Sequence, residues 1–249
     1  MSDLRSVVDQ MGREVTFVSA PKRVLSIVPS QTEFLIELGA DVVGRTKFCI
    51  HPSNEIKSVP IFGGTKNLRL EAIRELGPDL IIGNKEENNE SDIRNLENEF
   101  PVWMSDIYSL EDSFDMMRTL GEILDLTDNA EKIIQDCKSS LSLVKGSCSG
   151  KVVYLIWQKP WMAAGRNTFI DHMLDYLGYE NVIKEERYPE LSTADIEALN
   201  PDYILFSSEP FPFKKQHLSE AESLWTKAKC QMVDGELFSW YGSRLKHWS

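Results

Sequence analysis

The sequence lacks the short motifs that mark common classes of enzyme. It contains no Gly-x-Ser-x-Gly elbow, no His-Glu-x-x-His pair and no Gly-x-Gly-x-x-Gly turn after a predicted strand. Each of these motifs would place a nucleophile, a zinc ion or a dinucleotide at a defined strand or helix end. Their absence argues against the corresponding hydrolases, peptidases and dinucleotide enzymes, and we expect the chain not to be an enzyme.

Long apolar runs and an excess of basic charge are also missing. No run approaches the roughly 20 apolar residues that a membrane-spanning helix needs. Residues 1–5 lack the basic, apolar and small-residue regions of a signal peptide. The formal net charge of −12 argues against nucleic acid or an anionic membrane as the main partner. We therefore expect a chain that either stays in the cytoplasm or has lost an export signal.

Cysteine and histidine are scarce, with four residues of each type. No two cysteines form a Cys-x-x-Cys pair, which excludes the usual zinc-ribbon and thioredoxin patterns. We expect free thiols, with one disulfide in an oxidising compartment as the alternative. Cys49 and His51 lie close in the sequence, but a metal site needs three or four convergent ligands, so no metal site is predicted.

Strands and helices alternate in both halves of the chain. In the first half, a buried strand at residues 24–28 leads into a helix that Ser30 caps and Gly39 ends. In the second half, a strand at residues 151–157 is followed by a helix at residues 169–177. This alternation predicts an α/β fold, with a parallel sheet flanked by helices in each half.

A helix–turn–strand unit built around Pro-Asp occurs twice. Residues 70–82 and residues 194–206 both contain a helical pattern, a Pro-Asp turn and an apolar strand. Proline cannot continue the helix and favours extended geometry in the residue before it, so each unit switches from helix to strand. The matched units predict two similar lobes. The alternative is that this unit is a generic connector of α/β proteins.

A long helix is predicted between the two halves. A helix capped by Ser109 is followed by a second helix, which Thr127 or Asp128 caps and which stops near Gly146. About 18 residues at about 1.5 Å each span roughly 27 Å, enough to cross from one lobe to another. We expect an N-terminal lobe at residues 1–126, a connecting backbone helix at residues 127–147 and a C-terminal lobe at residues 148–249.

Aromatic side chains follow the predicted strands of the second half. Trp157 ends one strand, Trp161 lies in the next loop, and Trp240 precedes Tyr241 near the C-terminus. Loops at the carboxyl ends of parallel strands bind ligands in α/β proteins, and aromatic rings supply large, rigid contact areas. These four residues are therefore candidates for a ligand wall. Two further tryptophans, which we assign to packing, are Trp103 and Trp225.

Two polar segments of the first half are further candidates. Residues 84–89 follow the strand at residues 80–82, and they form either a polar binding loop or a solvated loop. Residues 63–66, Gly-Gly-Thr-Lys, are rich in glycine but lack the spacing of a phosphate-binding loop. We predict a tight turn there, with Lys66 facing a ligand as the alternative.

Seven segments, spread over nearly the whole chain, match the pattern of one known family. They are residues 9–15, 21–26, 29–33, 59–64, 70–79, 181–182 and 200–202. Together they resemble the helical-backbone, or class III, substrate-binding proteins of ABC importers. Members of this family bind cobalamin or ferric siderophores, and the likeness is somewhat greater to the cobalamin branch. The resemblance implies two α/β lobes joined by one long helix, with the ligand in a cleft between the lobes.

The resemblance also implies what the chain binds. The expected role is to capture a small-molecule ligand, a corrinoid, and deliver it to a membrane permease. We expect an exported or periplasmic monomer. No intrinsic cofactor and no nucleic-acid partner are expected. The alternatives are an iron chelate of the ferric-siderophore type, a direct zinc or manganese receptor, and a cytoplasmic sensor or enzyme on the same scaffold. The siderophore alternative would use cationic side chains, namely Lys47, Lys66, Lys85 or Arg166.

Family ligands contact loops at the strand ends, which gives a set of expected site residues. The expected ligand-binding residues are Pro29, Ser30, Gln31, Lys47, Phe48, Lys85, Glu86, Trp157, Trp161, Trp240 and Tyr241. An acidic residue on each lobe docks to the permease in this family, and Glu71 matches the first. At the second position the sequence has Ala194, with Asp195 beside it. One residue rotates a helical side chain by about 100°, so Asp195 is not an automatic substitute.

Overall fold

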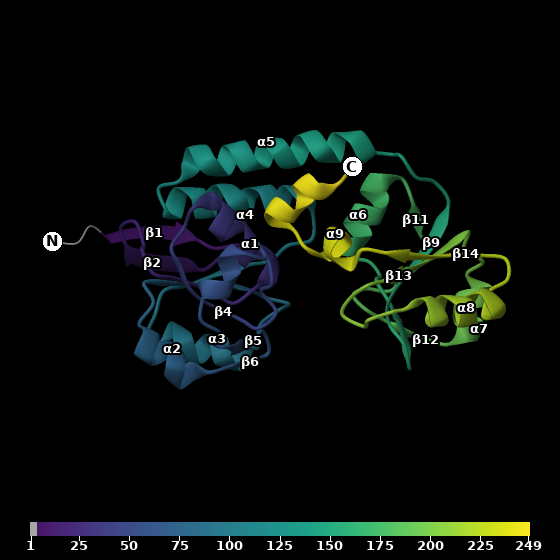
Figure 1. Cartoon of the computed structure of the whole chain (residues 1–249), viewed down its shortest axis with the longest axis horizontal. Helices are drawn as coiled ribbons and strands as arrows, with labels where there is room; N and C mark the ends of the chain where they lie inside the picture. Colours follow the sequence, from purple (N-terminus) through teal and green to yellow (C-terminus); the bar gives the residue numbers. More distant parts are fainter. Residues whose placement is uncertain (1–3) are drawn as a thin grey trace. The chain divides into compact units, whose positions relative to one another are not determined.

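The computed structural model describes residues 4–249, so the first three residues of the N-terminal segment lie outside the described residues. The chain forms two compact units, which are described separately (Figure 1). Unit 1 comprises the described residues up to Asp106, together with Glu111–Lys138 and Gly242–Lys246. Unit 2 comprises Ile107–Leu110, Ser139–Tyr241 and His247–Ser249. Each unit has its own sheet flanked by helices, which confirms the α/β fold class.

The sheet of unit 1 has four parallel strands in the order β4-β3-β7-β8. Their bounds are Val24–Ser26 for β3, Val42–Arg45 for β4, Leu80–Asn84 for β7 and Val102–Ser105 for β8. Helices α2 (Leu70–Leu76) and α3 (Glu90–Glu97) cover one face, and Leu25 and Ile81 join their core cluster. Figure 1 shows α1 (Pro29–Leu38) and α4 (Leu110–Ile123) on the other side. Burial on both faces explains why these strands are almost entirely apolar.

Two short hairpins complete the described strands of unit 1. Strands β1 (Leu4–Val8) and β2 (Glu14–Val18) pair in one, and β5 (Gly63–Gly64) and β6 (Asn67–Leu68) in the other. A short 3-10 helix, η1, lies at Glu55–Ser58. The predicted tight turn at residues 63–66 is confirmed. A Cβ on Gly63, whose φ is +108°, would lie 2.3 Å from the Asn67 carbonyl oxygen, so only glycine fits there.

The first helix starts within one residue of the predicted position, but the prediction that Ser30 caps it was wrong. Helix α1 begins at Pro29 and Ser30 lies inside it, while its N-cap is Val28, which makes no side-chain cap. Proline suits this position because its missing N–H would have had no partner in the first turn. The strand before it is also shorter than predicted and ends at Ser26. The end is as predicted, with Gly39 in the left-handed conformation.

The sheet of unit 2 mixes parallel and antiparallel strands in the order β12-β10-β9-β13-β14, and β11 also pairs with β9. Strands β9, β13, β14 and β11 pair in parallel, whereas β10 and β12 are antiparallel additions, so the parallel prediction holds for the central strands. The bounds are Lys151–Trp157 for β9, Trp161–Ala163 for β10, Glu180–Asn181 for β11, Glu190–Leu191 for β12, Tyr203–Ser207 for β13 and Lys229–Val233 for β14.

Helices cover both faces of this second sheet. Figure 1 shows α7 and α8 on one side and α6 and α9 on the other. Alternate side chains of the central strands point to opposite faces of the sheet. On one face, Val153 and Leu155 of β9 pack in the core cluster that contains Ile196 of α7 and Ala221 of α8. The helices are α6 at Phe169–Leu177, α7 at Thr193–Ala198, α8 at Lys215–Leu224 and α9 at Gly235–Ser239.

Helix α5 (Thr127–Val144) is the long helix that the sequence predicted, with 18 residues. Its first turn already includes Thr127 and Asp128, so the helix begins at the predicted caps rather than after them. The boundary between the two units falls inside this helix, after Lys138. The division into two lobes and a separate connecting helix stays a prediction. All four cysteines are free thiols.

The last turn of the chain, η2 (Gly242–His247), places residues 242–246 in unit 1. The Gly242 N–H donates to Ser113 Oγ at 2.9 Å. The Arg244 guanidinium makes a two-pronged ion pair with Glu33, with Nε 3.0 Å from Oε2 and a second nitrogen 2.9 Å from Oε1. Both side chains are largely buried, at 4% exposed for Glu33 and 12% for Arg244. Burial raises the pKa of Glu33 to about 7, against the opposing effect of Arg244.

This shift predicts a pH dependence of stability. The folded chain holds a proton on Glu33 more tightly than the unfolded chain, so this carboxyl stabilises the fold fully only below its unfolded pKa of about 4.5. That contribution is lost as the pH rises through about 7. Between pH 5 and pH 8, the unfolding free energy of Glu33→Gln should therefore decline less than that of wild type. The difference between the two declines should be at most about 3 kcal/mol.

Urea unfolding at pH 5 and pH 8 measures the effect. Glu75→Gln, on an exposed position of α2, is the matched control and should leave the wild-type slope intact. Equal slopes for wild type and Glu33→Gln would contradict the expectation.

Candidate functional site

The carboxyl ends of the four parallel strands of unit 1 meet at one edge of its sheet. The loop after β3 leads into Pro29, the loop after β4 carries Lys47 and Phe48, and the loop after β7 carries Lys85 and Glu86. Because parallel strands end at the same edge, this edge gathers the expected ligand residues of unit 1. It is the candidate site of unit 1.

A buried amide network ties these loops to one another. The Gln31 amide donates to Ser105 Oγ, and the Asn84 amide donates to the same oxygen at 2.9 Å. The Asn88 amide donates to the carbonyl oxygens of Ile27 and Thr65, each at 3.2 Å, and its own oxygen accepts from the Asn84 N–H at 2.8 Å. Hydrogen bonds of this kind are strengthened by the low dielectric of the interior. The network therefore fixes where each loop leaves the sheet.

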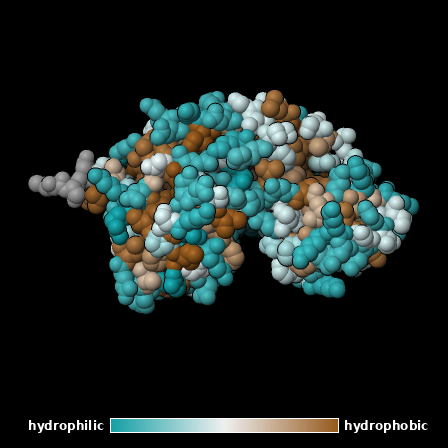
Figure 2. All heavy atoms as spheres, in the orientation of Figure 1, coloured by the Kyte–Doolittle hydropathy of each residue, from teal (hydrophilic) through white to brown (hydrophobic). Residues whose placement is uncertain are grey.

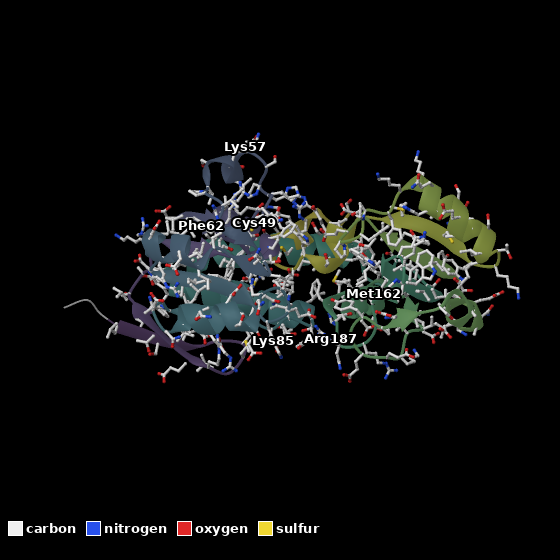
Figure 3. The ribbon with its side chains drawn as sticks, turned by 90° about the horizontal axis from the view of Figure 1, so that it is seen from below. Cys49, Lys57, Phe62, Lys85, Met162 and Arg187 are labelled. Carbon is white, nitrogen blue, oxygen red and sulfur yellow. The ribbon has the colours of Figure 1, made fainter. Side chains whose placement is uncertain are left out.

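Two of the expected ligand residues lie inside unit 1 rather than on its surface. Gln31 is fully buried, and Ser30 is 4% exposed. The Gln31 amide is part of the amide network, which points to a supporting role for this residue. Cys49, the buried cysteine labelled in Figure 3, lies nearby and accepts a hydrogen bond from Thr32 Oγ1 at 3.1 Å. Burial raises the pKa of this thiol, so it stays protonated.

The exposed part of this edge is apolar as well as cationic. Phe48 is 50% exposed, and the Lys47 ammonium lies 4.9 Å from the centre of its ring. Ile50, also 50% exposed, was missed by the sequence reasoning, although it stands two residues after Phe48. Lys85 is paired with Asp106 at 2.6 Å, and Lys66 donates to the Glu86 carbonyl oxygen. Two of the four cationic side chains that a siderophore would need are thus already bonded to other groups of the protein.

In unit 2, the carboxyl end of β9 carries an exposed aromatic patch, which we define as Trp157, Phe211 and His217. Trp157 is the last residue of β9 and is 39% exposed. The Phe211 ring meets it edge-on, with the centroids 5.3 Å apart, and the His217 ring lies 5.4 Å from Phe211. Phe211 and His217 were not predicted. The only sequence signal is the aromatic and proline-rich run at residues 209–213.

Trp161 lies in different surroundings from Trp157, and its expected role in ligand binding stays a prediction. Its ring contacts Phe206, Phe213 and Trp225, at centroid distances of 6.3, 6.4 and 5.2 Å. Its indole N–H donates to Thr193 Oγ1 at 3.3 Å. Trp161 is therefore half-buried in the aromatic core of unit 2. The assignment of Trp103 and Trp225 to packing is confirmed, because they are 0% and 4% exposed.

Trp240 and Tyr241 are also largely buried, at 8% and 7% exposed. The Trp240 indole N–H donates to a carboxylate oxygen of Glu209 at 2.8 Å. The Tyr241 ring meets Phe169 edge-on, with the centroids 5.9 Å apart. These contacts hold the segment after α9 against the rest of unit 2. Their expected role in ligand binding stays a prediction.

The two expected docking residues differ in their surroundings. Glu71, in the first turn of α2, has a side chain that is 87% exposed, and its carboxylate is 2.6 Å from Arg74. Asp195 forms a capping box on α7, in which its carboxylate accepts from the Ser192 N–H at 2.8 Å. Hydrogen bonds from Ser192 lower the pKa of Asp195. Asp195 is exposed, so it caps its helix and is also solvated. Figure 2 shows a mostly hydrophilic surface over α7 and α8.

Unit 2 also contains a polar cavity of about 390 Å³ beside α6. Its lining mixes both signs of charge, with Arg166 and Lys184 opposed by Asp171 and Asp175. Within residues 4–249, no group of three or more His, Cys, Asp or Glu side chains is arranged to hold a metal ion. None of the helices in the described part of the chain has the length and apolar character to cross a membrane.

Comparisons with known sequences agree with this geometry. A family described as "Periplasmic binding protein" matches residues 24–227. The chain is 25% identical over 215 residues to the uncharacterized ABC transporter substrate-binding lipoprotein YvrC of Bacillus subtilis, covering 80% of this chain and 68% of that protein. It is 24% identical over 199 residues to the vitamin B12-binding protein of Salmonella choleraesuis, covering 76% and 74%.

Two further similarities bear on ligand and fold. A probable siderophore-binding lipoprotein of Bacillus subtilis, YfiY, is 36% identical over 90 residues, which is 34% of this chain and 28% of that protein. Among solved structures, a possible iron-binding periplasmic protein of Staphylococcus epidermidis superposes with a TM-score of 0.77 at 23% identity, covering 92% of this chain and 95% of the other. This structural likeness supports the fold.

The amide network predicts a loss of stability on a single substitution. Asn88→Ala removes two donated bonds and leaves the buried Asn84 N–H without its acceptor, so the unfolding free energy should fall by about 2 kcal/mol or more. Urea unfolding measures this change. Asn95→Ala is the matched control, because Asn95 is exposed and donates to one carbonyl oxygen within its helix. Equal losses in the two variants would show that the network does not stabilise the loops.

Proposed function

The chain belongs to the periplasmic binding protein family, as a solute-binding protein of an ABC importer, and on this premise we propose that its solute is a corrinoid. The observation that carries the proposal is the exposed aromatic patch at the carboxyl end of β9, with Trp157 39% exposed. Large exposed apolar side chains at a strand end mark a binding surface. The likeness to vitamin B12-binding proteins over most of both chains supports the choice of ligand.

The chemistry of a corrinoid suits these surfaces. A corrin ring has wide apolar faces, and its rim carries amide groups that accept and donate hydrogen bonds. Trp157 and Phe211 in unit 2, and Phe48 and Ile50 in unit 1, offer rigid apolar area for such faces. We propose that surfaces of this kind contact the ligand and that the ligand leaves chemically unchanged.

A ferric siderophore is the second candidate, favoured by the local likeness to YfiY. An anionic iron chelate needs cations that are available to it. Lys85 is paired with Asp106, and Lys66 is bonded to the Glu86 carbonyl oxygen, so the exposed Lys47 and Arg166 would carry most of the attraction. Binding through such cations would weaken strongly with salt. Burial of a corrinoid against aromatic rings would not.

We also propose that the chain acts outside the cytoplasm. YvrC is a lipoprotein of an ABC transporter, and the family is one of periplasmic binding proteins. Delivery to an importer requires the solute to be captured on the side from which it is imported. The proposal therefore includes an export route for this chain.

Titration with cyanocobalamin tests the corrinoid assignment. Wild-type protein should bind with quenching of tryptophan fluorescence, and Trp157→Ala should weaken binding about tenfold or more, because an exposed indole wall is lost. Leu143→Ala removes another exposed apolar side chain of unit 2, 74% exposed on α5, and should leave the affinity unchanged. Chromatography of the released ligand should return intact cyanocobalamin.

The same titration separates the two candidate ligands. Binding of a ferric trihydroxamate or tricatecholate with steep salt dependence, and no response to cyanocobalamin, would replace the corrinoid by a siderophore. If Trp157→Ala binds cyanocobalamin as tightly as wild type, the aromatic patch is not part of the binding site.

Permease docking makes a separate prediction. Glu71→Arg should abolish stimulation of the importer's ATPase activity in proteoliposomes while leaving ligand affinity unchanged, because Glu71 is 87% exposed and the substitution reverses its charge. Glu220→Arg, at an exposed position of α8, is the charge-matched control. Asp195→Ala should mainly destabilise α7 through loss of its capping box. Full stimulation by Glu71→Arg would refute the docking role.

A further inference from the structure

His217 completes the hydrogen bonding at the start of α8. It is the third residue of that helix, after Lys215 and Gln216. The backbone N–H of Lys214, the N-cap, donates to His217 Nδ1 at 2.8 Å, and the His217 N–H donates back to the Lys214 carbonyl oxygen at 2.9 Å. Glutamate or glutamine usually occupies this position in a capping box. Histidine here performs the same task with a ring nitrogen.

This hydrogen bond assigns the position of the ring proton. A neutral imidazole carries one N–H, and the other nitrogen is an acceptor. Since Nδ1 of His217 accepts from a backbone N–H, the ring proton must be on Nε2. A nitrogen that carries a proton has no lone pair for a metal. His217 is therefore a hydrogen-bond donor at Nε2 and not a metal ligand.

The donor belongs to the aromatic patch. The His217 ring is held edge-on by Phe211 and Phe213, with centroid distances of 5.4 and 5.7 Å. Phe211 in turn contacts Trp157, the exposed end of β9. The ring is half-buried, and no side chain or carbonyl group among residues 4–249 accepts a hydrogen bond from its Nε2. A fixed donor thus lies beside an exposed apolar surface.

We infer that His217 donates a hydrogen bond from Nε2 to a carbonyl or amide oxygen at the rim of the bound ring ligand, and that it orients this ligand without touching its metal. The inference rests on the proposed function, because it assumes that the aromatic patch contacts the solute. It adds a specificity element. The patch would accept a broad apolar face, and the donor would select ligands with an acceptor oxygen at its edge.

Two matched substitutions isolate the donor. Glutamine and glutamate both complete a capping box at this position, but only glutamine carries N–H donors. His217→Gln should therefore bind cyanocobalamin within about threefold of wild type, and His217→Glu should bind about tenfold more weakly. Thermal unfolding should show both variants folded. Equal affinities for wild type, His217→Gln and His217→Glu would overturn the inference.

Aquocobalamin tests the metal part of the inference. Replacement of its cobalt-bound water by an imidazole shifts its visible absorption bands. Wild-type protein and His217→Gln should give the same spectrum of the bound ligand. A shift that is present in wild type and lost in His217→Gln would show that His217 coordinates the cobalt, which would overturn the inference.

Failure of the proposed function is distinguishable from failure of the inference. If wild-type protein does not bind cyanocobalamin, the same pair of variants is titrated with hemin and with a ferric trihydroxamate, where His217→Glu should again be the weaker. If wild-type protein binds none of the three probes, the inference that His217 contacts the ligand is overturned. Nitrogen-15 NMR of the ligand-free protein tests the tautomer of His217 independently of any ligand. A proton on Nδ1, or a signal averaged over both nitrogens, would overturn the assignment of the proton to Nε2.

Discussion

Parallel pairing of the central strands decides where the exposed apolar side chains lie in each unit. Strands that run in the same direction must end at the same edge, so the loops that follow them converge there. In unit 1 this edge presents Phe48 and Ile50, and in unit 2 it presents Trp157. The helices that connect the strands cover both faces of each sheet and leave the edges for other tasks. The position of these exposed apolar side chains is therefore a consequence of how the strands and helices pack.

Several elements could be predicted because local signals agreed with their final environment. The strand Lys151–Trp157 and the helix Phe169–Leu177 were predicted with the bounds that the structure shows, since apolar spacing and a terminal glycine pointed the same way. The cap of α1 was wrongly predicted because Pro29 and Ser30 both suit a helix start, and Ser30 is buried inside the first turn. Short-range patterns do not contain that information.

The candidate site was less accessible to sequence reasoning than the fold. Trp157 and Trp161 look alike in the sequence, yet one is exposed at a strand end and the other is held by three aromatic rings. Phe211 and His217 join Trp157 only because the segment after β13 returns to β9, where the Phe211 N–H donates to the Ile156 carbonyl oxygen at 3.4 Å. A contact between residues so far apart in the chain has no local signature.

The return of residues 242–246 to unit 1 has a consequence for how the protein is made. Neither unit is a continuous stretch of chain, and the main segment of unit 2, Ser139–Tyr241, lies between two segments of unit 1 in the sequence. Domains of most proteins fold in order as they leave the ribosome. Here Arg244 pairs with Glu33, and Gly242 donates to Ser113, so unit 1 is started first but is complete only when residue 246 has been synthesised. The buried carboxyl group of Glu33 therefore has no ion-pair partner in Arg244 until almost the entire chain has been synthesised.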